Sequence, residues 1–74
     1  MNYIQQAAKK LIKKHHTNDP LQICELENIN VTIATLPQQI KGFYTKLFHL
    51  PFIFLNDRLS HYEKRVVCAH ELGH

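Results

Sequence analysis

The sequence of 74 residues predicts a small α+β domain, with helices at the N-terminus, an antiparallel sheet of about three strands, and a final helix. Three observations predict this class. Apolar residues near the start of the chain recur with helical period, and those between residues 31 and 55 alternate or gather in short runs. A Ser-x-x-Glu pattern at residues 60–63 then marks a new helix start. No linker or repeat divides the chain, so we expect a single unit over residues 1–74.

The first helix is expected over residues 2–16. Its stripe of apolar residues is spaced at i, i+3, i+4, i+7 and i+8, and comprises Ile4, Ala7, Ala8, Leu11 and Ile12. The helix closes with the adjacent residues His15 and His16. Because neighbouring residues do not share a helix face, this pair suits a helix end better than a metal site.

A second, short helix is expected to start at Asp19 and to end near Asn28. Asp19 is a suitable cap, Pro20 suits the first helical position, and Gln22 would complete a variant of the capping box.

Strands are expected in the middle of the chain, first at residues 31–34 and then at residues 40–48, with Gly42 as a bulge or a point of close approach. A turn at residues 49–51 would lead into the apolar strand at residues 52–55, which makes an antiparallel hairpin.

The last helix is expected over residues 62–74 and ends in the sequence H-E-L-G-H. Residues four apart lie on one helix face, so His70 and His74 could bind the same metal ion. Glu71 lies beside them and could act on a metal-bound water without being a ligand. These are two ligands and the general base of a zinc peptidase. A simpler alternative is an amphipathic helix that happens to carry two histidines.

Composition and charge exclude several classes of protein. The longest apolar run is far too short to span a membrane, and no segment resembles a signal peptide. Cys24 and Cys68 are too few for a disulfide framework, so we expect reduced, buried thiols in a cytoplasmic protein. Cys68 is a minor candidate ligand, because its offset from His70 points it away from the histidine face. The net charge of +3 reflects a solvated helix face more readily than nucleic-acid binding, and includes Lys9, Lys10, Lys13 and Lys14.

Three segments together carry a family resemblance: K-G-F-Y at residues 41–44, L-N-D at residues 55–57, and V-C-A-H-E-L-G-H at residues 67–74. The chain resembles the N-terminal part of the ImmA/IrrE family of metallopeptidases. The resemblance implies an active-site helix on a small antiparallel sheet, with His70 and His74 as zinc ligands and Glu71 as the catalytic base. It also implies a protein substrate, namely a helix-turn-helix repressor of the phage type.

The family pattern continues beyond H-E-L-G-H with helices that supply a third, usually acidic, zinc ligand. We therefore expect this chain to be a truncated N-terminal portion, with weak or absent Zn²⁺ binding and no measurable peptidase activity. The α-carboxylate of His74 or another chain could replace the third ligand. We also expect homo-oligomers through uncovered apolar surface, formed by Phe52, Phe54, Val66 and Val67. The competing reading is an interaction module that binds a repressor or another protein without chemistry.

Overall fold

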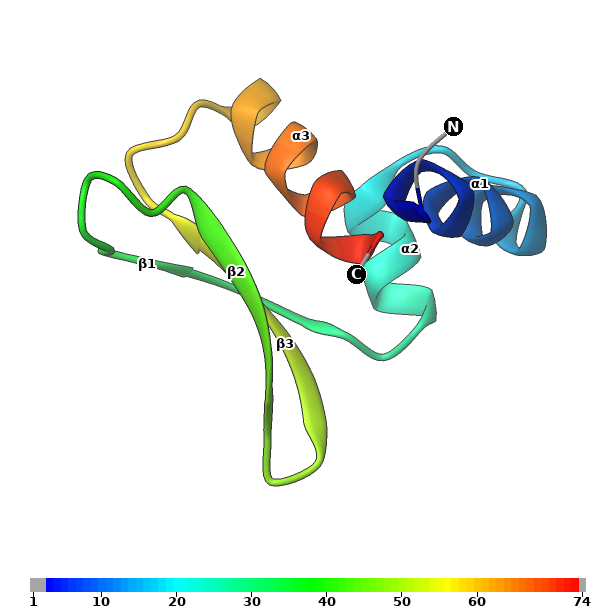
Figure 1. The fold of residues 1–74 in the computed structure, drawn as a ribbon, viewed down its shortest axis with the longest axis horizontal. Helices are drawn as coiled ribbons and strands as arrows, with labels where there is room; N and C mark the ends of the chain where they lie inside the picture. The colour runs from blue at the N-terminus through cyan, green and yellow to red at the C-terminus, as the bar shows by residue number, and fades with distance from the viewer. Residues whose placement is uncertain (1–2, 74) are drawn as a thin grey trace.

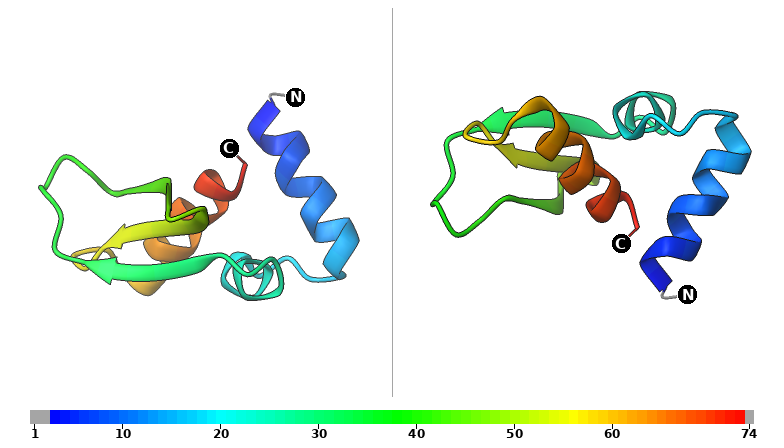
Figure 2. Two further views of the ribbon diagram at one scale, coloured as in Figure 1. Left: turned by 90° about the horizontal axis from the view of Figure 1, so that it is seen from below. Right: turned by 90° about the horizontal axis from the view of Figure 1, so that it is seen from above.

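The computed structural model describes the backbone of residues 3–73 and the side chains of residues 9–73. It confirms the α+β class. Helix α3 lies on one face of the sheet, whereas α1 and α2 lie beyond the end of the sheet (Figures 1 and 2). The elements follow one another as α1 (Tyr3–His15), α2 (Pro20–Leu26), β1 (Asn30–Ala34), β2 (Gly42–Leu47), β3 (Leu50–Asn56) and α3 (His61–Leu72).

Helix α1 ends where the two adjacent histidines predicted it. His15 is its last residue, and His16 has a φ of 56°, a left-handed conformation that stops the helix. The side chain of His15 lies toward the following helix, with its Nε2 atom 3.4 Å from the carboxylate of Glu27. The Nζ atom of Lys14 lies 3.1 Å from the same carboxylate. This hydrogen bond from Lys14 holds the pKa of Glu27 below its ordinary value.

Helix α2 begins at Pro20 with Asp19 as its cap. The carboxylate of Asp19 accepts a hydrogen bond from the N–H of Leu21 at 3.1 Å, as predicted. The expected capping-box role of Gln22 is wrong. Its side-chain oxygen accepts from the hydroxyl of Thr17 at 2.8 Å, and the Asp19 N–H donates to Thr17 instead.

The sheet is mixed, with the strand order β1-β3-β2, and this corrects the prediction of an antiparallel sheet. Strands β2 and β3 form the expected antiparallel hairpin, but β1 pairs in parallel with β3. The most apolar strand takes the centre, where Ile53 and Leu55 are completely buried. The connection over residues 35–41 must cross the end of β3, a span of about 10 Å for two strand spacings, which seven residues reach easily.

Asn56, a buried polar side chain with 2% exposure, holds this crossing connection in place. Its amide group donates to the main-chain carbonyls of Leu36, Pro37 and Ile40 at 3.2, 3.3 and 2.9 Å. Its carbonyl oxygen accepts from the N–H of Arg58 at 3.2 Å. The side chain therefore supplies hydrogen-bond donors to main-chain carbonyls of the connection, which have no partner strand.

The hairpin turn lies one residue earlier than predicted. Phe48 and His49 form a two-residue loop with φ values of 51° and 67°, between the paired residues Leu47 and Leu50. Pro51, expected in the turn, lies in β3. Strand β1 pairs with β3 only from Phe52 onward, so the missing N–H of Pro51 breaks no bond on that side.

The core lies between the sheet, α2 and α3. Gly42 was predicted as a point of close approach, and the structure confirms it: a Cβ atom there would lie 2.6 Å from the carbonyl oxygen of Phe54 and 2.9 Å from a methyl of Val67. The absence of a side chain thus lets α3 sit directly on β2. The core side chains without exposure are Cys24, Ile53, Leu55 and Cys68, and those packed around them are Ile29, Val31, Tyr44, Val67 and Leu72.

Candidate active site

Helix α3 starts with the predicted capping box. The hydroxyl of Ser60 accepts a hydrogen bond from the N–H of Glu63 at 3.1 Å, and the Glu63 carboxylate accepts from the N–H of Ser60 at 2.9 Å. The bond from the Ser60 N–H keeps the pKa of Glu63 below its ordinary value. The capping box fixes where α3 begins and so determines which residues face the sheet.

The helix continues through His70 and Glu71 and ends at Leu72, with Gly73 as the C-cap. Gly73 has a φ of −75°, and its N–H donates to the carbonyl of His70 at 3.1 Å. His74 lies outside the described residues. The expectation that His70 and His74 share one face therefore stays a prediction, whereas the first residues of the motif lie in a helix.

The faces of α3 separate exposed from packed residues. Tyr62, Val66 and His70 are four residues apart and all exposed, the first two by 76% and 50%. We call these three residues the outer stripe. Val67 was expected on the histidine side, but it packs against the core. Glu71 is half-buried at the border between the two faces, next in sequence to His70.

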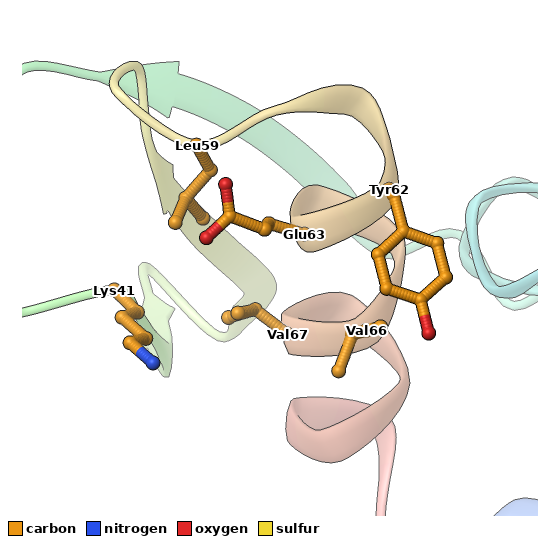
Figure 3. A pocket seen from close by; sticks show the side chains of 6 residues that line it. All are labelled: Lys41, Leu59, Tyr62, Glu63, Val66 and Val67. Atoms are coloured by element: carbon orange, nitrogen blue, oxygen red, sulfur yellow. The ribbon is translucent and has the colours of Figure 1, made fainter.

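A small cleft of about 100 Å³ lies beside Tyr62 and Val66 of the outer stripe, between α3 and the start of β2. Its walls are mostly apolar, and its charged residues are Lys41 and Glu63. Figure 3 shows Lys41 on the strand side of the cleft and Glu63 on the helix, with the Glu63 carboxylate beside Leu59. Such a cleft can accept an apolar side chain and a polar group at its rim. The other side chains that line it are Leu59, Tyr62, Val66 and Val67.

Cys68 faces away from the outer stripe, into the core. Its Sγ atom lies 3.4 Å from the Sγ atom of Cys24 on α2, and both thiols are free and fully buried, as predicted. The hydrogen bond between the thiols holds the pKa of Cys24 below its ordinary value. The same bond, together with burial, raises the pKa of Cys68. Within residues 9–73, no group of three or more His, Cys, Asp or Glu side chains is placed to hold a metal ion.

Two further expectations concern the surface. The four lysines of α1 are exposed, as expected for a solvated helix face. In the part of the chain that the structure describes, no helix has the length and apolar character needed to cross a membrane.

Comparison with known proteins identifies the class of this fold and motif. The model of a peptidase family, described as the IrrE N-terminal-like domain, matches residues 24–74. The chain belongs to this family, and the resemblance to ImmA/IrrE proteins is confirmed.

The chain is also similar to immunity region protein 2 of Bacillus phage phi105, with 39% identity over 71 residues. The match covers 96% of this chain and 45% of the relative, so the chain spans about half the length of the phage protein. No solved structure matches.

Proposed function

We propose that this chain supplies part of a zinc peptidase active site, with His70 and His74 as metal ligands and Glu71 as the general base. The observation that supports this best is the continuous helix through His70 and Glu71, with His70 on the outer stripe. Membership in a peptidase family supports the same assignment.

The donor set fits zinc, because imidazole nitrogens with a nearby carboxylate are the groups that catalytic zinc sites use. A bound Zn²⁺ would act as a Lewis acid on water and on the scissile carbonyl. Glu71 would accept the proton of the attacking water and later donate it to the leaving amine. Its half-buried position on α3, next in sequence to His70, suits this task.

The substrate we propose is a phage-type repressor with a helix-turn-helix domain. The phage relative is named for an immunity region, and this supports a substrate from the same regulatory system. The cleft beside the outer stripe would take an apolar substrate side chain. Strand β2 is an edge strand against α3, so an extended segment of substrate could add to it.

Zinc binding tests the ligand assignment. With His70 and His74 as the two proposed ligands, we expect the 74-residue chain to bind Zn²⁺ weakly and to show no measurable turnover. Calorimetric titration should show His70→Ala weakening the affinity by about tenfold or more. His61→Ala removes an exposed histidine at the other end of α3 and should leave the affinity unchanged. Equal affinities for wild type and His70→Ala would refute the assignment.

The role of Glu71 is separable from that of the ligands. Glu71→Gln should keep the Zn²⁺ affinity of the wild type, because Glu71 is proposed as a base and not as a ligand. Cleavage of a repressor peptide by the 74-residue chain, abolished by Glu71→Gln, would confirm the base and disprove the expected lack of turnover.

A binding role without chemistry is the second candidate, and the open face of the sheet favours it. Phe43 and Phe54 stack there with ring centroids 5.0 Å apart, and Phe52 lies 5.9 Å from Phe54. The turn residue Phe48 is 97% exposed at the tip of the hairpin, which projects away from the helices in Figure 1. By the alternation of side chains along β2, Phe43 shares this face with Thr45 and Leu47, which are uncharged. We therefore propose that a second copy of the chain covers the open face.

Sedimentation velocity at tens of micromolar tests this self-association. Phe48→Ser should shift the chain toward monomer, whereas Tyr62→Ser, which changes another exposed aromatic residue on α3, should not. A wild-type chain that stays monomeric would exclude the dimer.

A further inference from the structure

The two cysteines of the chain lie together although they are 44 positions apart in sequence. Cys24 belongs to α2 and Cys68 to α3, and their Sγ atoms are 3.4 Å apart. Both side chains are completely buried among apolar neighbours. A hydrophobic core needs no sulfur at these positions, but two thiols in contact have a chemistry that neither has alone.

We infer that Cys24 and Cys68 form a reversible disulfide when the protein meets a hydroperoxide. An S–S bond is about 2.05 Å long, so the sulfur atoms need to approach by about 1.4 Å. Rotation about χ1 of the two side chains, with a small shift of α2, provides such a movement. The bond would join α2 covalently to the helix that carries His70.

The oxidation has two balanced steps. The sulfur of one cysteine attacks an oxygen of hydrogen peroxide, the O–O bond breaks, and a sulfenic acid and one water result. The sulfur of the second cysteine then attacks the sulfenic sulfur, the S–O bond breaks, and a second water leaves. Two thiols and one peroxide thus become one disulfide and two waters. Added dithiothreitol reverses the change by thiol–disulfide exchange.

Access to the buried thiols comes through the shortest helix of the fold. Helix α2 has 7 residues, packs on α1, β1 and α3, and is not part of the sheet. Local opening of so short an element costs less free energy than global unfolding. Hydrogen peroxide is close to water in size and needs only a small opening.

The experiment uses the folded chain treated with hydrogen peroxide, then unfolded and alkylated with N-ethylmaleimide. Intact mass should show a monomer lighter by about 2 Da that carries no maleimide. Trypsin should release peptide 15–41 joined to peptide 66–74, and dithiothreitol should separate them. The oxidised monomer should also unfold at higher urea concentration than the reduced one, because the bond closes a long loop.

Cys24→Ser and Cys68→Ser are the matched controls. Each keeps one thiol, so neither should show the mass loss or the linked peptides. The linked peptides of the wild-type chain test the inference even if a variant does not fold. Wild-type chain that takes up two maleimide groups after peroxide, or that forms only links between chains, would overturn the inference.

Discussion

The side-chain amide of Asn56 donates a hydrogen bond of 2.9 Å to the main-chain carbonyl of Ile40, and so ties the central strand to the connection that crosses its end. The same amide group reaches the carbonyls of Leu36 and Pro37. A single buried side chain therefore organises the segment that allows β1 and β2 to lie on opposite sides of β3.

Replacement of this side chain should destabilise the whole fold. Asn56→Ala leaves carbonyls of the connection without a donor, and we expect a loss of about 1–3 kcal/mol in the free energy of unfolding. Urea denaturation followed by circular dichroism measures the loss. Arg58→Ala is the control, because Arg58 is exposed and its bond to Asn56 comes from the main chain. Equal stability of the two variants would contradict the role of Asn56.

Gly42→Ala should destabilise by roughly 1–3 kcal/mol, because the new Cβ atom would overlap the packed carbonyl of Phe54. The added methyl also approaches Val67, whose side chain can be shortened. Since the carbonyl belongs to the main chain and cannot be removed, Val67→Ala should fail to restore the stability of Gly42→Ala. Recovery of stability in the double variant would show that the clash with Val67 of the helix, and not the clash with the Phe54 carbonyl, causes the loss.

The hairpin turn offers a stabilising change. Phe48 and His49 both have positive φ, which is unfavourable for residues with bulky side chains. The pair Asn-Gly is preferred in such two-residue turns, so the double variant Phe48→Asn, His49→Gly should gain about 1–2 kcal/mol in urea denaturation. Lower stability would show that Phe48 makes a contact worth more than the strain.

Stability should fall in acid because of two glutamates. The folded pKa of Glu63 and that of Glu27 lie below the ordinary value of 4.5, so both groups favour the folded state when ionised. Their contribution is fully present above pH 4.5 and is lost as the pH falls through the folded pKa values. The difference in urea midpoint between wild type and Glu63→Gln should therefore shrink on acidification. A difference that does not depend on pH would contradict this cause.

Local patterns predicted the helices well, because caps act between residues close in sequence. Ser60 and Glu63 form the predicted box, and Asp19 caps α2. The role of Gly42 was also predictable, since a glycine inside a strand of large residues indicates that another part of the chain packs closely against it.

Features that depend on distant residues were not predictable in the same way. The burial of Ile53 and Leu55 goes with the central place of β3, and β1 pairs in parallel with that strand. No local pattern encodes either feature. The contact of Cys24 with Cys68 arises only once α2 packs on α3.

The turn was misplaced because Phe48 and His49 are not typical turn residues. For the candidate site, the sequence H-E-L-G-H correctly predicted a helix that contains His70 and Glu71. Which side of that helix is exposed depends on how it packs on the sheet, and only the structure shows it.

The strand order has a consequence for synthesis on the ribosome. Both outer strands precede the central one in the chain. Asn30 of β1 can therefore pair with Phe52 of β3 only after β3 has been synthesised. Until β3 has left the exit tunnel, β1 and β2 have no partner, and their apolar side chains face water. The nascent chain therefore cannot build its sheet strand by strand, and gains it in one late, cooperative event.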